Sequence, residues 1–545
     1  MLTRLRSYMR RGDPAIWFAG SGLGICLVLI AAMIAVILRN GLGYFWPGEL
    51  VRLELRGEEV LMGEIVAREV IPRPGEPTHR DHRIQLKVGN RDVAGVDFRW
   101  IDESEIVARA HPDDAVYIER REYGPFIGYP EALLRDGETV VEGREATWRA
   151  LQPLVEQAEA DRAAIRRLER HEVGAINHRI EQVRLELRRR QLESGADGAA
   201  AAEVRALAAR TEALEAEYAQ LEERLAERYT EASRTSVRLA TAAGDEQELA
   251  TLEIFRAYRA NQLSTAGRAR VYASRLWEFL SADPRESNTE GGIFPAIFGT
   301  VMMVILMSIM AVPLGVLAAL YLREYARQGW LVRTVRIAVN NLAGVPSIVF
   351  GLFGLGFFVY FVGGTIDQLF YPEQLPTPTY GSGGILWASL TLGLLTIPVV
   401  IVASEEALAA VPRSMREASL ATGATKFQTI MRVVLPAAAP GVLTGLILAM
   451  ARGAGEVAPL MITGVVKLAP DLPLDGYFPY LHLERKFMHL GFHIYDVGFQ
   501  SPNVEAAKPM VYATTILLLL IVVLLNLTAI IVRNRLRRKY QTSAF

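Results

Sequence analysis

The chain contains very little cysteine and lacks a nucleotide-binding loop. Cys26 is the single cysteine among 545 residues, so a disulfide within the chain is excluded and we expect this residue to serve packing. No Gly-x4-Gly-Lys-Ser/Thr segment is present, the loop whose backbone donors cradle nucleotide phosphates. We therefore predict that the chain is not an enzyme and has no catalytic residues or cofactor of its own. Any ATP and magnesium that it depends on would be bound by a partner.

An excess of one charge is also missing, whereas apolar residues are plentiful and clustered. The formal net charge is −1 and 51% of the residues are hydrophobic, which a large soluble protein could share. The clustering favours a membrane protein, because a hydrocarbon core of about 30 Å needs roughly 20 apolar residues of helix. We expect a lipid bilayer around the chain and no nucleic-acid partner. Six runs are long enough to span: residues 16–38, 293–322, 332–362, 385–411, 437–466 and 511–532.

Basic residues flank these six runs on one side. Because Lys and Arg near span ends stay on the cytoplasmic side, both termini are expected in the cytoplasm of a multi-pass inner-membrane protein. Residues 1–15 and 533–545 are then cytoplasmic basic ends, and residues 41–291 lie outside, in the periplasm. The basic clusters are Arg4, Arg6, Arg10 and Arg11; Arg323, Arg327 and Arg333; Arg413, Arg416, Lys426 and Arg432; and Arg533, Arg535, Arg537, Arg538 and Lys539.

The large segment between the first two runs divides into two parts. Residues 41–145 contain short alternating runs separated by Gly, Pro and Asp turns, which predicts a small β-rich domain. In residues 146–291, apolar residues recur three and four apart on both sides of the turn signal at residues 194–198, which predicts an antiparallel coiled-coil hairpin. The spaced positions are Val173, Ile176, Ile180, Val183 and Leu187, then Val204, Leu207, Thr211, Leu214, Tyr218, Leu221 and Leu225.

Histidines in the expected outer segments do not predict a metal site. His171, Glu172 and His178 lack the HExxH spacing that holds zinc on one helix face. His489 and His493 are four apart, but two histidines without further ligands do not define a metal site. The simpler interpretation of that pair is a satisfied pair in an interfacial amphipathic segment. Taken alone, the insertion would suit a membrane-anchored periplasmic coiled-coil receptor or tether.

A polar stretch between the fourth and fifth runs, residues 417–436, predicts an amphipathic helix that is too polar to cross lipid. Gly423 removes side-chain bulk, which suits either close approach of another backbone or a sharp bend. Pro436 suits the first turn of the following helix. A docking surface and an ordinary loop helix are equally open at this point. The apolar positions at near-helical spacing are Ala418, Leu420, Ala421, Phe427, Ile430, Met431 and Val434.

Two ionisable residues, Arg452 and Glu456, fall well inside the fifth apolar run. Charges are costly in lipid and usually face a cavity or a partner, and residues four apart share a helix face and can pair. Gly453 and Gly455 leave the helix surface open beside them. The planar donors of Arg452 would suit an oxyanion, with Glu456 as the partner when the anion is absent. An ion pair that merely joins two helices is the alternative.

The polar stretch resembles the EAA loop of ABC importer permeases, which in that family docks in a groove of the ATPase subunit. The resemblance extends over twenty residues, with Ser419 in place of the second Ala of the pattern and Val433 in place of its Ile. It implies that residues 412–436, called here the EAA-type loop, couple the chain to an ATPase. The coupling residues would be Glu417, Ala418, Ser419, Gly423, Leu435 and Pro436.

Further segments narrow the resemblance to phosphate-specific permeases of the PstA type. Residues 341–352, 405–408 and 452–460 look like parts of that family, and the likeness covers about residues 293–540. It implies a mainly α membrane protein with six transmembrane helices of the type I ABC importer permease fold, its core at residues 293–532. The implied partners are a second permease of the PstC type, an ATPase homodimer and a periplasmic phosphate-binding protein.

The same resemblance implies phosphate as the cargo, with Arg452 and Glu456 on its pathway. Spacing and charge do not separate phosphate from sulfate or molybdate, so these oxyanions remain open. The periplasmic insertion is a departure from the compact members of the family, which pass from the first span to the second through a brief loop.

Overall fold

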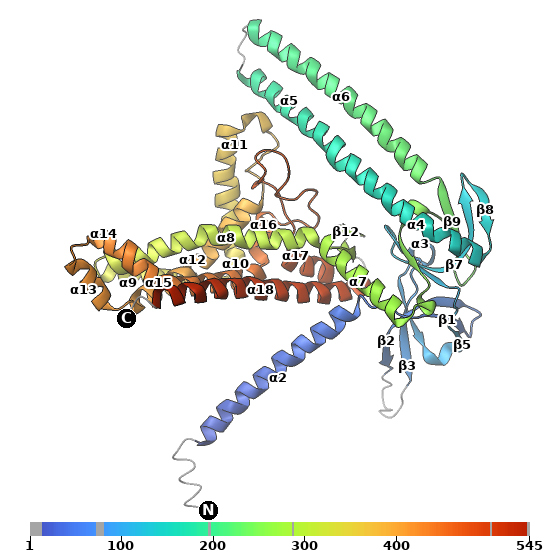
Figure 1. Ribbon diagram of the computed structural model, residues 1–545, viewed down its shortest axis with the longest axis horizontal. Helices are drawn as coiled ribbons and strands as arrows, with labels where there is room; N and C mark the ends of the chain where they lie inside the picture. The colour runs from blue at the N-terminus through green and yellow to red at the C-terminus, as the bar shows by residue number, and fades with distance from the viewer. Residues whose placement is uncertain (1–12, 72–80, 194–197, 286–287, 502–503, 542–545) are drawn as a thin grey trace, which may run out of the picture.

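A computed structural model of the chain describes residues 13–71, 81–193, 198–285, 288–501 and 504–541. Figure 1 shows three parts: a bundle of long helices, a β-rich unit at one end of it, and two long antiparallel helices that rise from the β-rich unit. The short helices α13 (Arg413–Ala421) and α14 (Lys426–Thr429) form the opposite end of the bundle. The predicted insertion and the EAA-type loop therefore lie at opposite ends of the molecule.

Six helices in the described part of the chain are long and apolar enough to span a membrane. Helices are expected there because a chain in lipid must satisfy its backbone hydrogen bonds within its own segment. The chain is a multi-pass membrane protein. Three spans consist of one helix each: Ile16–Gly43 in α2 (Asp13–Gly43), Ile385–Ala410 in α12 (Ile385–Ala410) and Ala506–Lys539 in α18 (Val504–Gln541). The span Phe294–Tyr325 consists of α8 (Phe294–Leu320) and η6 (Tyr321–Tyr325), and the span Lys426–Gly455 consists of α14, η9 (Ile430–Val434) and α15 (Leu435–Gly455). The span Ser347–Phe370 consists of α10 (Ser347–Phe353), η7 (Gly354–Gly363) and α11 (Gly364–Phe370).

The third span begins later than predicted. The apolar run at residues 332–362 is divided, because a separate amphipathic helix, α9 (Trp330–Leu342), ends before Pro346 and the span starts at Ser347. Proline cannot donate a backbone hydrogen bond within a helix, so the chain turns at this point. Arg336 of α9 pairs with Glu405 of α12 at 3.2 Å, which fixes α9 against the end of the bundle.

The fifth span ends earlier than predicted. The run at residues 437–466 is divided into α15, which ends at Gly455, and the short helix α16 (Ala458–Thr463). Glu456 between them has extended backbone angles, φ −80° and ψ 133°. Pro459 in the first turn of α16 packs against Gly351 of α10, where a Cβ on the glycine would lie 2.7 Å from the proline Cα. Hydropathy alone does not predict this interruption, because α15 and α16 are both apolar.

The core of the bundle lies where α12 packs between α8 and α15. α12 is the most enclosed span, with 67% of its apolar window buried. Small residues on the neighbours allow close approach: a Cβ on Gly315 of α8 would lie 2.6 Å from Val400, and one on Gly445 of α15 would lie 2.7 Å from Ala403. Both contacts are made to α12, so this helix is held from two sides.

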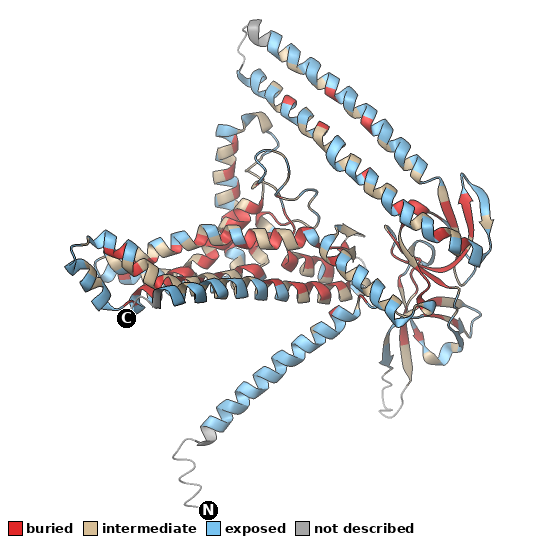
Figure 2. Ribbon diagram, viewed as in Figure 1, coloured by how far each residue is buried: buried red, intermediate tan, exposed pale blue. Residues whose placement is uncertain are grey.

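The first span, α2, is the least enclosed, with 0% of its apolar window buried. Figure 2 shows α2 exposed along almost its whole length. Its contact with the bundle is at its C-terminal end, where a Cβ on Gly41 would lie 2.6 Å from Ile516 of α18. Away from this contact, α2 and α18 diverge (Figure 1). Lipid or another subunit must cover the apolar surfaces that the divergence leaves bare.

The β-rich unit begins with a five-stranded antiparallel sheet in the order β4-β3-β2-β1-β5. On β1, the buried residues Val51 and Leu53 alternate with the more exposed Arg52 and Glu54, as expected for a strand with one face in a core. The predicted β-rich region is confirmed. The strands are β1 (Leu50–Leu55), β2 (Val60–Val70), β3 (His82–Lys87), β4 (Phe98–Asp102) and β5 (Ile106–Ala110).

A second antiparallel sheet, in the order β10-β9-β7-β6-β11 with β8 beside β7, uses strands from both sides of the long helices. The expectation of a helical region throughout residues 146–291 is therefore wrong for residues 235–258. Their alternation is short, and β9 is stabilised by β7, which lies far away in sequence (Tyr129 opposite Ala240). The strands are β6 (Val116–Arg120), β7 (Phe126–Arg135), β8 (Glu138–Glu142), β9 (Thr235–Ala240), β10 (Glu246–Ala250) and β11 (Ile254–Tyr258).

The two long helices are α5 (Gly174–Glu193) and α6 (Gly198–Ala232), and they lie antiparallel side by side (Figure 1). Ile176 and Val183 of α5 and Leu214 and Leu221 of α6 are buried at spaced positions, as the apolar repeat predicts. The predicted turn at residues 194–198 lies largely outside the described residues. α4 (Arg144–Arg167) and η2 (Leu168–Val173) connect the hairpin to the second sheet.

The hairpin also contacts the helical bundle. The ring of His178 on α5 stacks on Tyr477 with centroids 4.4 Å apart, and Arg189 pairs with Glu373 at 3.2 Å. Tyr477 and Glu373 belong to two loops that follow different spans, so α5 connects the β-rich unit to both. The remaining elements are α3 (Arg91–Ala94), η1 (Glu103–Glu105), η3 (Thr251–Glu253), η4 (Ala260–Gln262), α7 (Thr265–Ser281), β12 (Pro284–Arg285), β13 (Glu290–Gly291), η8 (Pro372–Gln374), α17 (Leu490–Tyr495) and η10 (Asp496–Gln500).

Candidate functional site

The EAA-type loop folds as two short helices joined by a sharp bend at Gly423. Gly423 has φ 84°, in the left-handed region that residues with a Cβ avoid, so a glycine is required by the backbone. No described atom outside its immediate neighbours lies within 4 Å of the position that a Cβ would occupy. The sequence left two roles open for Gly423, a sharp bend or the close approach of another backbone. The structure shows the bend, and the space beside the Gly423 Cα is open, so a partner could approach there.

Ser419, which departs from the EAA pattern, joins the two helices of the loop. Its Oγ lies 2.9 Å from Oγ1 of Thr429 on α14, and its backbone carbonyl accepts a hydrogen bond from the Thr422 hydroxyl at 2.8 Å. An alanine at this position could not make the side-chain contact. On the other side of the bend, Thr425 caps α14 in a reciprocal capping box with Gln428. The loop is thus a defined helix-turn-helix rather than a single helix.

Two cations of the loop are anchored on the end of the second span. Arg416 donates to the backbone carbonyls of Leu408 and Val411 at 2.7 and 2.8 Å and pairs with Glu324 at 3.0 Å. Lys426 donates to the backbone carbonyl of Glu324. Sequence patterns placed both cations in a basic cluster near the span ends and did not single out Glu324. Glu324 therefore joins the loop to the end of the second span.

Several apolar side chains of the loop are exposed although others are buried. Ile430 and Val434 lie in the core beneath the loop, as predicted apolar positions should. Phe427 is 63% exposed and Leu420 is 49% exposed, which is costly for a free surface. Glu417, Ala418 and Gly423 are also exposed, whereas Ser419, Leu435 and Pro436 are partly buried where the loop enters α15. The exposed apolar set of the loop is Met415, Leu420, Phe427 and Met431.

The structure brings Arg452 and Glu456 together at the interruption of the fifth span. Nε of Arg452, in the last turn of α15, lies 3.5 Å from Oε1 of Glu456, so the contact is an ion pair and not a close hydrogen bond. Neighbouring Gly453 packs on Met307, near the middle of α8, which places the pair within the depth of the bundle. Both side chains are partly exposed, at 33% and 22%. Among the described residues, the ion pair of Arg452 is made through Nε, and a third of its side chain is exposed.

Interrupted helices are where irregular backbone can meet a solute inside a membrane. Gly455 is exposed, with no described atom within 4 Å of a Cβ position, so the chain beside the ion pair faces open space. The arrangement combines a guanidinium, a loosely held carboxylate and accessible backbone. It can hold an anion reversibly, because the carboxylate competes for the same guanidinium.

His489 and His493 are buried rather than interfacial, so the prediction of a satisfied pair is wrong. Nδ1 of His489 accepts a hydrogen bond from the backbone of Gly491 at 3.1 Å, whereas both ring nitrogens of His493 lack a partner among the described residues. Burial lowers the pKa of His489 to about 3, and burial together with nearby Lys467 lowers the pKa of His493 to about 4. In the described part of the chain, no group of three or more His, Cys, Asp and Glu side chains could hold a metal ion.

Acid is expected to destabilise the packing around α17. An unfolded histidine titrates near 6.5, whereas His493 stays neutral until about pH 4 in the folded chain, so stability is full above pH 6.5 and falls as the pH drops toward 4. By pH 5 the loss is about 2 kcal/mol for each such histidine. Between pH 7.5 and 5, the thermal denaturation midpoint of the purified chain should fall less in His493→Leu than in the unsubstituted chain. Exposed His171→Leu is the control, and an unchanged pH dependence in His493→Leu would contradict the assignment.

Both sites lie in a segment that matches a known family. The family described as "Binding-protein-dependent transport system inner membrane component" matches residues 311–541. The phosphate transport system permease protein PstA of Pasteurella multocida (strain Pm70) is 31% identical over 207 residues, which are 38% of this chain and 67% of that protein. The chain belongs to this family of inner membrane components. The residues matched contain the whole EAA-type loop and the Arg452–Glu456 pair.

Other relatives agree with this membership. The inner membrane component is 36% identical over 188 residues to the phosphate transport system permease protein PstA of Yersinia pestis (34% of this chain, 57% of that protein). It is 34% identical over 202 residues to the probable ABC transporter permease protein YqgH of Bacillus subtilis (36% and 62%). The chain thus spans a little over half the length of these relatives. The resemblance to PstA-type permeases is confirmed, and the insertion lies outside the residues matched by the family.

Proposed function

We propose that the protein is a permease subunit of an ATP-driven importer that moves inorganic phosphate across the inner membrane. The observation that carries this proposal is the exposed apolar set of the EAA-type loop, on a defined helix-turn-helix at the end of the bundle away from the insertion. An exposed apolar surface of this kind marks a protein contact. In this family of transport components, the contact would be with the ATPase subunit, as the EAA resemblance implies.

The proposed topology places the EAA-type loop and both termini in the cytoplasm. The basic clusters near the span ends support this orientation, and the insertion then lies in the periplasm. The proposed assembly pairs this chain with a second permease of the PstC type, an ATPase homodimer and a periplasmic phosphate-binding protein. Glu324 would transmit movement, because it connects the loop to the end of the second span through Arg416 and Lys426.

Arg452 and Glu456 are the proposed contacts of the anion on its pathway. A partly exposed guanidinium at a helix interruption supports this role, since its planar donors match the oxygens of a tetrahedral oxyanion. Phosphate is preferred to sulfate or molybdate because relatives at 31–37% identity are named as phosphate transport system permeases. Another oxyanion is the second candidate, and the experiment below separates the two.

A receptor or tether with the spans as anchors is the competing function. It would account for the exposed hairpin, but it gives no role to the bend at Gly423 or to an ion pair at a helix interruption. The contacts of α5 with Tyr477 and Glu373 place the hairpin beside the loops at the insertion end of the bundle. We propose that the hairpin serves the transporter at this face rather than an unrelated partner.

Copurification followed by an ATPase measurement in lipid tests the proposed function. The tagged full chain, purified from native membranes, should bring down an ATPase, a second permease and a binding protein. After reconstitution, binding protein loaded with phosphate should stimulate ATP hydrolysis, whereas sulfate or molybdate should not. Stimulation by sulfate or molybdate in place of phosphate would establish the other oxyanion. Purification without an ATPase would favour the receptor or tether.

A further inference from the structure

A cavity of about 430 Å³ lies where the β-rich unit meets the ends of two spans. Its lower wall comes from Asn40 and Gly43 at the end of α2 and from Tyr512 near the start of α18. Its upper wall comes from the first sheet, β6 and α7. A cavity of this size is in the usual range for small-molecule sites. Because the spans begin or end at its floor, it is positioned at the surface of the membrane.

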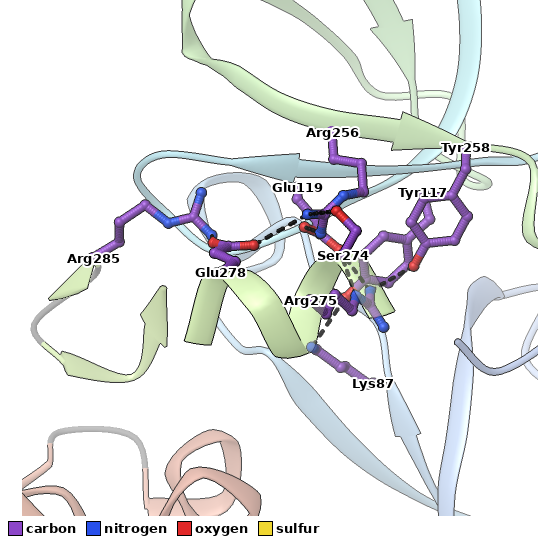
Figure 3. A network of polar contacts seen from close by, with 9 residues as sticks. All are labelled: Lys87, Tyr117, Glu119, Arg256, Tyr258, Ser274, Arg275, Glu278 and Arg285. Carbon is purple, nitrogen blue, oxygen red and sulfur yellow. Dashed lines mark hydrogen bonds and ion pairs between the residues drawn. The ribbon is translucent and has the colours of Figure 1, made fainter. Parts of the chain in front are cut away.

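One wall of the cavity is formed by a network of buried charges joined by hydrogen bonds and ion pairs (Figure 3). Glu119 accepts a hydrogen bond from Arg275 at 2.7 Å and another from Arg256, and Glu278 pairs with Arg285 at 2.5 Å. Arg275 also donates to the Tyr258 hydroxyl at 2.6 Å. The two guanidiniums on Glu119 outweigh its burial and keep the pKa of this carboxyl below its ordinary value. This wall therefore holds two carboxylates against three guanidiniums, and its charged groups are held in place by one another.

Glu64 and Lys87 lie opposite each other on β2 and β3, and both line the cavity. Opposed residues in an antiparallel pair have their side chains on one face of the sheet. No ion pair joins these two among the described residues, and the ammonium of Lys87 instead donates to the Tyr117 hydroxyl at 3.1 Å. By contrast, Glu69 and Arg83, opposed on the same two strands, form an ion pair at 2.9 Å. Glu64 and Lys87 thus present an anion and a cation side by side and not neutralised by each other, and Glu290 and Lys508 also line the cavity.

The surroundings of the cavity suit an amphipathic ligand. Tyr44 and Trp46 line it just beyond the end of α2, at the level where aromatic side chains gather at membrane surfaces. Toward the membrane, Leu38 and Leu42 of α2 are 40% and 42% exposed. These residues lie on either side of Gly41, where α2 contacts α18, so exposed apolar side chains are present between the charged cavity and the part of α2 that diverges from α18 (Figure 1).

We propose that this cavity binds the headgroup of an ethanolamine phospholipid from the outer leaflet. Lys87 would hold the lipid phosphate and Glu64 its ammonium group, since the ligand carries both charges a short distance apart. The acyl chains would cover the diverging faces of α2 and α18. This inference assigns a lipid site at the junction of the β-rich unit and the spans. It rests on the proposed function for the topology that puts this junction at the outer leaflet, and it does not depend on which anion is carried.

Native mass spectrometry of the full chain with its copurified partners, after delipidation, tests the lipid site. The complex is titrated with phosphatidylethanolamine, phosphatidylglycerol and soluble O-phosphoethanolamine. Glu64→Gln and Lys87→Gln should each weaken phosphatidylethanolamine binding about tenfold, the effect of losing one charge-assisted contact. Glu64→Gln should leave phosphatidylglycerol binding unchanged or strengthened, because that lipid has no amine for the carboxylate to hold.

The matched controls are Glu69→Gln and Arg83→Gln, which alter the same charges on the same strands outside the cavity. They should leave binding of all three ligands unchanged. Equal weakening by the controls, or equal effects of Glu64→Gln on the two lipids, would overturn the proposal. Binding of soluble O-phosphoethanolamine as tight as that of the lipid would also overturn it, because the acyl chains would then contribute nothing.

Discussion

Replacing Arg452 with alanine is expected to abolish anion uptake while the complex still assembles. The substitution removes the donors at the interruption between α15 and α16, where no other guanidinium pairs with Glu456 among the described residues. Loss of two charge-assisted hydrogen bonds, each about 1.5–3 kcal/mol, lowers uptake by at least about a hundredfold. Uptake of radiolabelled phosphate into cells without another importer measures the effect, and copurification of the partners measures assembly.

Two neighbouring variants separate charge from geometry at this site. Arg452→Lys keeps the charge but loses the planar fork, so it should retain a small fraction of uptake. Glu456→Gln removes the carboxylate that competes with the anion, so the anion should be held more tightly and released more slowly. Normal uptake in Arg452→Ala, with normal assembly, would remove Arg452 from the pathway and leave the ion pair as a contact within the bundle.

Replacing Phe427 with aspartate is expected to prevent capture of the ATPase. Phe427 is 63% exposed on α14, and an aromatic anchor buried in an interface contributes at least about 2 kcal/mol, a factor of roughly thirty in affinity. Aspartate adds the cost of burying a charge. Copurification of the ATPase with the tagged chain measures the loss. Trp277→Asp is the matched control, because this residue is 70% exposed on α7 at the other end of the bundle.

Variants of Gly423 test the same interface through the backbone. Gly423→Val should uncouple the ATPase, because a β-branched residue resists φ 84° and adds bulk to the open space outside the bend. Gly423→Asn tolerates the left-handed conformation better, so it should preserve more binding if the bend is what matters. Undisturbed copurification in Phe427→Asp and Gly423→Val together would contradict the docking role of the EAA-type loop.

Apolar clustering predicted the number of spans but not all their boundaries. The run at residues 385–411 matches α12 closely because its ends coincide with a change in polarity, whereas the run at residues 511–532 covers only the middle of α18, which continues through the basic residues after it. The third and fifth runs were read as continuous because Pro346 and Glu456 interrupt segments that are apolar on both sides. Strands β9–β11 were missed for another reason. Their partners β6 and β7 lie on the far side of the hairpin in sequence, and no local pattern indicates such pairing.

The candidate site was predictable where it depends on spacing along one helix. The polar element predicted at residues 417–436 lies between the fourth and fifth spans only as far as Thr425, because the fifth span already begins at Lys426, and Arg452 and Glu456 do meet. Glu324 was not predicted, because its contacts with Arg416 and Lys426 cross from one span end to another. The burial of His489 and His493 was also missed, since their neighbours come from other elements, such as Thr300 of α8, whose hydroxyl accepts from the backbone of Leu490. Long-range contacts of this kind leave no periodic signal.

The pairing of β6 with β11 has a consequence for biogenesis. Arg120 lies opposite Ile254, and the whole of α4, α5 and α6 is made between them. The second sheet therefore cannot close until the hairpin and the strands after it have been synthesised. Such distant pairing slows folding. During that interval α2 is the span that tethers the unfolded segment, because α8 and the spans after it come later in the chain.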